Sequence, residues 1–124
     1  MKNLIAVAAG GALGASLRYL SLLLVSRLSV AGFNIATLCV NAAGCFFAGF
    51  IFAWTDKGQA PMAARLFFIT GLIGAYTTLA AFGLECLYYL KNGSWLYFCA
   101  DILLTNAVSL FMIWQGYKAY GWFA

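Results

Sequence analysis

Histidine is absent from this chain of 124 residues, and charged residues make up only 8% of it. Without an imidazole the chain has no histidine acid–base group and no histidine metal ligand. Soluble domains usually carry about 25% charged residues, so an ordinary soluble domain is excluded. The net charge is +4, but the basic residues form no cluster or arm, and nucleic-acid binding therefore has no support.

Cysteine is present without a metal-binding or redox spacing. The four cysteines all fall inside apolar stretches, and no CxxC pair occurs: Cys39, Cys45, Cys86 and Cys99. Such thiols behave as small buried apolar groups. No serine or cysteine has a base in evident reach, so we expect a protein that is not an enzyme.

Hydrophobic residues dominate what remains, at 65% of the chain with a mean hydropathy of +0.94. Four apolar stretches each approach the roughly 20 residues that cross a bilayer: Leu4–Val25, Ile35–Trp54, Leu66–Leu90 and Trp95–Tyr117. Only short connections separate them: Ser26–Asn34, Thr55–Arg65 and Lys91–Ser94. We therefore expect an all-α membrane protein, with residues 1–124 as a single four-span transmembrane domain.

The third stretch has an unusual centre, which runs from Thr70 to Thr78. It holds Gly71 and Gly74 and then three hydroxyl-bearing residues, where an ordinary span would carry leucines. Glycine lowers helix propensity and threonine hydroxyls can take over freed backbone bonds, so we expect a break at mid-membrane. Broken spans tend to hold ions through loose carbonyls and helix-end dipoles. The alternative is a continuous helix whose glycines serve close packing.

The basic residues give a weak topology signal. With four spans, one side carries four basic residues and the other two, or three with Arg18. The first set is Lys2, Lys57, Arg65 and Lys118, and the second is Arg27 and Lys91. Positive loops normally face the cytoplasm, so this bias mildly favours cytoplasmic termini. It permits both insertion in two orientations and one fixed orientation.

Small residues recur at a spacing of four in the first two stretches, as Gly10-xxx-Gly14 and Gly44-xxx-Ala48. This pattern allows helices to approach closely. It is compatible with a dimer interface and equally with packing inside one subunit.

Two polar residues lie at membrane depth in the first half of the chain, where burial is costly. Arg18 either extends its long side chain to the interface or attracts anions at a vestibule. Asn41 shares a helix face with Thr37 and offers two N–H donors, which suit an anion. The alternative for Asn41 is a hydrogen bond between helices.

The second half of the chain carries a polar stripe and an embedded acid. Asp101, Thr105 and Ser109 follow one another at i, i+4 and i+8, with Asn106 beside them, and such a stripe lines a water path or meets another polar face. Glu85 is compatible with a cation or proton carrier, with a protonated acid, or with an acceptor that positions hydroxyl groups.

Two aromatic residues, Tyr76 and Phe82, flank the centre of the third stretch. Ring edges are electropositive, so an edge can contact a small anion.

These residues together resemble the Fluc/CrcB family of small fluoride channels, over essentially the whole chain. Four segments carry the resemblance: Gly10-Gly11-Ala12-Leu13-Gly14 with Arg18-Tyr19, Ala36-Thr37-Leu38-Cys39-Val40-Asn41, Thr70–Thr78 with Phe82 and Glu85, and Ser109. The third is similar to the family pattern Thr-Gly-x-x-Gly-Gly-x-Thr-Thr-Phe-Ser-Thr-Phe-Ser-x-Glu.

The resemblance implies a dual-topology homodimer with two antiparallel pores. It also implies a structural sodium ion at the dimer centre, held by the backbone carbonyls of Gly74 and Thr77. The pore asparagine falls on Asn41, one pore phenylalanine on Phe82 and the acid of the polar track on Glu85. We add Thr78, Ser109 and Arg18 to the expected anion path.

Several positions depart from the family pattern. A pore phenylalanine is replaced by Leu79, the following Ser-Thr by Ala80-Ala81, and a threonine of the fourth span by Ile113. Other departures are Ala75, Gly83 and Val108. These changes remove hydroxyls and one ring edge from the expected path, so they bear on the conduction rate and on whether both pores work.

The expected function is a fluoride channel subunit that exports fluoride passively, lowers its cytoplasmic concentration and resides in a bacterial inner membrane. One alternative is a small four-span multidrug cation exporter, a class that depends on a glutamate in its first span. Here the first stretch has Arg18 and no acid. The other alternative is a poorly conducting partner subunit of a heterodimeric fluoride channel.

Overall fold

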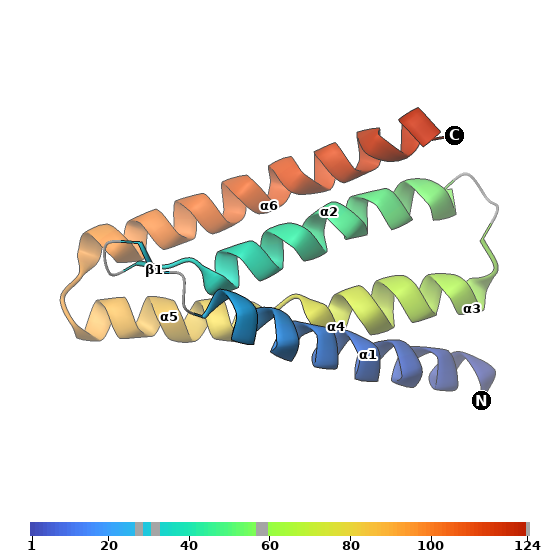
Figure 1. The fold of residues 1–124 in the computed structure, drawn as a ribbon, viewed down its shortest axis with the longest axis horizontal. Coiled ribbons are helices and arrows are strands. Elements are labelled where there is room, and N and C mark those ends of the chain that lie inside the picture. Colours follow the sequence, from blue (N-terminus) through green and yellow to red (C-terminus); the bar gives the residue numbers. More distant parts are fainter. Residues whose placement is uncertain (27–28, 31–32, 57–59, 124) are drawn as a thin grey trace.

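The structure, a computed structural model, describes residues 1–26, 29–30, 33–56 and 60–123. Long helices lie side by side and contain most of the described residues (Figure 1). They are α1 (Lys2–Val25), α2 (Ala36–Asp56), a discontinuous segment made of α3 (Met62–Arg65), η1 (Leu66–Ile73), α4 (Gly74–Tyr76) and α5 (Leu79–Lys91), and α6 (Trp95–Phe123). Among the described residues, four segments are long and apolar enough to cross a membrane. The predicted all-α, four-span fold is confirmed.

The observed spans run beyond the apolar stretches. The third begins at Met62 rather than Leu66, because Pro61 adopts an extended backbone and the helix can start directly after it. The fourth continues from Tyr117 to Phe123. Both chain ends lie at the same end of the bundle (Figure 1). Lys57 and Arg27, which entered the charge argument, lie outside the described residues.

Two short strands lie in the connection between α1 and α2. Strand β1 (Ser29–Val30) pairs antiparallel with β2 (Phe33–Asn34). The Phe33 ring stacks on Tyr89 with ring centroids 6.0 Å apart, so this hairpin is fixed against α5.

Small residues set the distances between helices inside the subunit. A Cβ on Gly14 would collide with the backbone of Leu72, and a Cβ on Gly10 with that of Phe67, so α1 lies directly against η1. A Cβ on Gly44 would collide with Thr77. Of the two explanations for the small-residue pattern, packing within one subunit is the one seen at Gly10, Gly14 and Gly44.

The predicted break in the third span is present, but its glycines do not make it. Gly74 has helical angles of φ −59° and ψ −33°. A Cβ on Gly71 would approach within 2.7 Å of the Val7 carbonyl oxygen, so Gly71 serves close packing. The chain leaves the helix at Thr77 (φ −72°, ψ 155°) and Thr78 (φ −145°, ψ 111°). Attributing the break to glycine was wrong, because Gly71 packs against α1 within the helix and Gly74 keeps helical angles.

Candidate anion groove at the helix break

Asn41 holds the break open from the neighbouring helix α2. In a continuous helix, the Thr78 amide would donate to the Gly74 carbonyl. Here it donates to Asn41 Oδ1 at 2.8 Å, and Asn41 Nδ2 donates to the Thr78 carbonyl at 3.2 Å. Asn41 is only 8% exposed, so these bonds form away from solvent. Asn41 thereby gives the Thr78 amide a partner in place of the Gly74 carbonyl.

Helix α5 restarts immediately after the break with its own N-terminal cap. The Thr78 Oγ1 atom accepts a hydrogen bond from the Ala81 amide at 3.2 Å. The end of α4 and the start of α5 therefore meet at one place, which puts helix-end carbonyls next to helix-start amides.

Arg18 lies beside this break. Its Nη1 atom donates to the Thr77 carbonyl at 3.5 Å, and the side chain is half-buried. The Arg18 guanidinium therefore meets a backbone carbonyl at the break.

A groove of about 240 Å³ opens at the break, between α2, α5 and α6. It is lined by Asn41, Cys45, Thr77, Thr78, Leu79, Phe82, Thr105, Asn106 and Ser109. Four of the expected anion-path residues, Asn41, Thr78, Phe82 and Ser109, thus share one surface. Thr105 and Asn106 were left out of the expected path, although the i, i+4, i+8 spacing of the α6 stripe could have included them.

Glu85 belongs to a different surface. Its Oε1 atom accepts hydrogen bonds from Asn34 Nδ2 at 2.6 Å and Thr37 Oγ1 at 2.7 Å. The Tyr89 hydroxyl oxygen accepts a hydrogen bond from the backbone amide of Asn34 at 3.1 Å. A separate groove of about 300 Å³ is lined by Asn34, Leu84, Glu85, Tyr88 and Tyr89. Asn34 and Tyr89 were not predicted, and their partners are 51 and 55 residues away in sequence.

A second acid, Asp101, is buried on α6 at 2% exposure. Its Oδ1 atom accepts from Thr105 Oγ1 at 3.1 Å, and its Oδ2 atom accepts from Cys86 Sγ at 3.7 Å. The same helix carries Asn106, whose Nδ2 atom donates to the Ile102 carbonyl at 2.7 Å. The predicted polar stripe is therefore partly buried and partly open to the groove.

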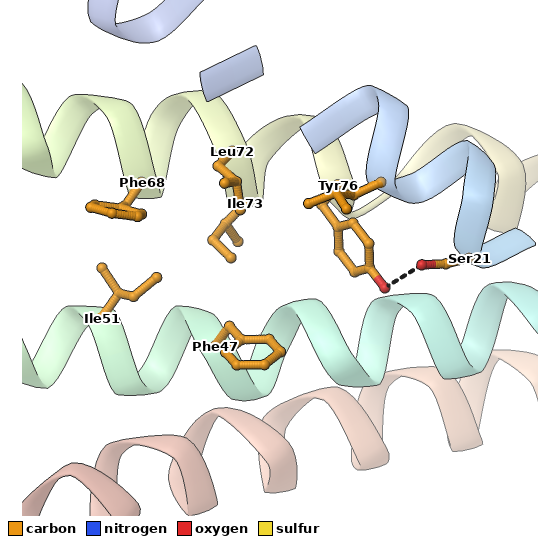
Figure 2. A pocket seen from close by; sticks show the side chains of 8 residues that line it. Ser21, Phe47, Ile51, Phe68, Leu72, Ile73 and Tyr76 are labelled. Atoms are coloured by element: carbon orange, nitrogen blue, oxygen red, sulfur yellow. Dashed lines mark hydrogen bonds between the residues drawn. The ribbon is translucent and has the colours of Figure 1, made fainter. Parts of the chain in front are cut away.

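A cavity of about 410 Å³ lies elsewhere and is apolar (Figure 2). Phe47 and Ile51 face Phe68 and Ile73 across it. Its polar contact joins the hydroxyls of Ser21 and Tyr76, 3.1 Å apart. Tyr76 therefore points away from the groove that Phe82 lines, and its expected contact with an anion is not supported. An apolar cavity of this kind offers nothing to a hydrated ion.

The fold is that of a small helical membrane protein with a discontinuous third span and a polar groove at the discontinuity. The family described as "CrcB-like protein, Camphor Resistance (CrcB)" matches residues 5–117. The chain belongs to this CrcB-like family.

Individual relatives cover nearly the whole chain. A Campylobacter jejuni protein named fluoride-specific ion channel FluC is 36% identical over 118 residues, which is 94% of this chain and 96% of the relative. A protein of the same name from Aquifex aeolicus is 41% identical over 113 residues, or 90% and 91% of the two chains. One from Legionella pneumophila is 38% identical over 113 residues, or 90% and 84%.

Proposed function

We propose that this chain is a subunit of a fluoride-specific ion channel, which lets fluoride leave a bacterial cell passively across the inner membrane. The observation that carries the proposal is the groove at the helix break, where Asn41, Thr78 and Ser109 gather hydrogen-bond donors beside the Phe82 ring. The names of the relatives, all from bacteria, point to the same ion. A channel of this family carries out transport rather than catalysis.

The groove can replace water around a small anion because its donors are not all committed. Asn41 Nδ2 has two N–H bonds, and the Thr78 carbonyl needs only one of them. Thr78 Oγ1 accepts from Ala81, which leaves its own O–H free to donate. Ser109 adds another hydroxyl, and the edge of Phe82 adds an electropositive surface. Fluoride is strongly hydrated, so selective passage requires such fixed donors.

Arg18 and Glu85 act outside the groove in this proposal. The positive charge of Arg18, next to the Thr77 carbonyl, draws anions toward the break. Glu85 is an acceptor that fixes the Thr37 hydroxyl and the Asn34 amide at the other groove. Of the alternatives for Glu85, the acceptor is favoured because two donors converge on a single carboxyl oxygen.

The backbone carbonyl oxygens of Gly74 and Thr77 would hold a structural sodium ion. The donor chemistry fits at Gly74, because its carbonyl has lost the Thr78 amide to Asn41 and hard cations prefer oxygen ligands. The Thr77 carbonyl also accepts a long hydrogen bond from Arg18 Nη1, at 3.5 Å, and a carbonyl oxygen has a second lone pair for a cation. Gly74 is also exposed, so an antiparallel partner subunit can complete the site. The positive charge of a bound sodium ion would offset the negative charge of the anion, and the ion would link two subunits. In the described part of the chain, no cluster of three or more acidic, cysteine or histidine side chains competes for a metal.

The alternatives are less well supported. A multidrug cation exporter of this size needs an acid in its first span, and α1 contains none. The alternative of a poorly conducting partner subunit rests on Leu79, Ala80 and Ala81, whose side chains carry no hydroxyl group and no aromatic ring.

The test is ion efflux from liposomes that contain the purified protein. We expect fluoride to leave rapidly and chloride to be retained, because the groove offers fixed donors to a small anion. Equal chloride and fluoride release contradicts a selective channel. Proton-coupled cation exchange supports the exporter, and silence supports the partner subunit. Co-expression with a second family member, if one is present in the source cell, separates a silent partner from a misfolded protein.

A further inference from the structure

Asp101 is an acid that the proposed anion path does not use. It is 2% exposed on α6, and both of its carboxyl oxygens accept hydrogen bonds from uncharged groups, the Thr105 hydroxyl at 3.1 Å and the Cys86 thiol at 3.7 Å. Burying a carboxyl group in this way is costly, so an acid at this depth is a candidate functional residue.

Asp101 reaches the groove through Thr105. Thr105 lines the groove and is 7% exposed, while Asp101 is not among the lining residues. The two residues are one helical turn apart, and the Thr105 hydroxyl spans the distance between the carboxyl group and the groove. A change in the protonation of Asp101 can therefore affect an ion in the groove through the Thr105 hydroxyl.

The hydroxyl of Thr105 has a single proton, and the state of Asp101 decides where that proton points. An ionised carboxylate only accepts hydrogen bonds, so the Thr105 hydroxyl points its proton at Asp101 and donates to it. A neutral carboxyl group can donate its own O–H to Thr105 Oγ1. The Thr105 proton is then free to turn toward the groove and donate to an anion.

We propose that Asp101 is a positioning residue whose protonation turns the Thr105 hydroxyl from a bond to Asp101 into a donor for fluoride in the groove. This inference rests on the proposed function. The proton that Asp101 takes up comes from water in the groove and returns there, so no other reactant is needed. The charge of ionised Asp101 repels an anion, which acts in the same direction as the lost donor.

Other ionisable groups near Asp101 come from α5 and must be separated from it. Its charge interacts with Glu85, Cys86 and Tyr89. Glu85 is bound by Asn34 and Thr37, and it does not line the Thr105 groove. Helix α2, which packs along α6, has one acid, Asp56, at its far end.

The experiment measures fluoride efflux across the neutral to alkaline range, with protein-free liposomes as the control for leak of hydrogen fluoride. We expect efflux through the parent protein to rise as pH falls. Asp101→Asn places a permanent N–H donor toward Thr105, so this variant should lose the pH response. At the alkaline end it should conduct about tenfold faster than the parent, the rate equivalent of one hydrogen bond to a charged group.

Thr105→Val separates positioning from charge. Valine has nearly the shape of threonine but no hydroxyl, so Asp101→Asn should give no comparable gain when combined with Thr105→Val. Thr105→Val alone should also weaken the rise in efflux at lower pH, which tests the inference even if Asp101→Asn does not fold. Glu85→Gln is the matched control and should keep the pH response.

Two results overturn the inference while leaving the channel in place. One is pH-independent efflux through the parent, and the other is a full gain from Asp101→Asn in the Thr105→Val background, which would mean that charge acts alone. Parent liposomes that release no fluoride at any pH overturn the proposed function instead, and the inference with it.

Discussion

Asn41 and Thr78 exchange two hydrogen bonds, from the Thr78 amide to Asn41 Oδ1 at 2.8 Å and from Asn41 Nδ2 to the Thr78 carbonyl at 3.2 Å. A side-chain amide thus pairs with the backbone as a neighbouring strand would. An asparagine carries the donor and the acceptor that this needs on one short side chain. These two bonds place Asn41, the main candidate donor to an anion, directly at the helix break.

Asn41→Asp should abolish fluoride efflux while the subunit stays folded. Aspartate keeps the acceptor for the Thr78 amide but loses the N–H donors and adds a negative charge to the groove. Repulsion between two charges about 4 Å apart is about 4 kcal/mol near a protein surface, or roughly a thousandfold in rate. Liposome efflux measures the loss, and size-exclusion chromatography reports the assembly. Parental efflux from a well-folded Asn41→Asp protein would remove Asn41 from the anion path.

Gly14→Ala should destabilise the protein, whereas Gly11→Ala should not. A Cβ at Gly14 collides with the Leu72 backbone, while nothing lies within 4 Å of a Cβ at Gly11. Overpacking of this kind costs about 1–3 kcal/mol. Thermal unfolding in detergent, followed by circular dichroism, compares the two variants. Equal unfolding temperatures for both would show that α1 and η1 are not in the close contact described.

Gly74→Val should weaken dimer assembly and its dependence on sodium without unfolding the single subunit. A Cβ at Gly74 meets only the Ile69 carbonyl oxygen, at 3.5 Å, so the helix itself tolerates a side chain. The branched side chain would instead crowd the exposed carbonyl that is proposed to hold sodium. Dimer dissociation, measured in sodium and in a large organic cation, tests this. Unchanged assembly and an unchanged sodium effect would argue against the site.

Replacing Leu79 by Phe, Ala80 by Ser and Ala81 by Thr should raise fluoride efflux. The two hydroxyls and the ring edge restore groups that the family pattern has near the break. Each hydrogen bond to a partly dehydrated anion is worth roughly 1–3 kcal/mol, and about 1.4 kcal/mol is tenfold in rate. Leu79 is 80% exposed in the single chain, so a larger ring meets no obstacle within the subunit.

The triple variant has to be compared with Gly83→Ala, a substitution on the same helix where a Cβ meets nothing within 4 Å. If the intact triple variant conducts no faster than the parent, these positions do not limit conduction. A working pore lined by a different partner subunit would then explain the lost side chains.

The sequence by itself determined that this is a four-span membrane protein with an interruption in its third span. Bilayer thickness sets the length of an apolar run, and the scarcity of charge leaves no soluble alternative, so both follow from local composition. Asn41 and Phe82, which the family resemblance placed on the expected anion path, both line the groove.

Only the tertiary structure decided where the backbone leaves the helix and which polar residues share a surface. The break lies at Thr77 and Thr78 because Asn41, 37 residues away, takes the Thr78 amide. Glu85 belongs to a different groove because Asn34 and Thr37 bind its carboxyl group from across the bundle. Hydrogen bonds between helices depend on how the helices dock, and no local pattern in one helix contains that information.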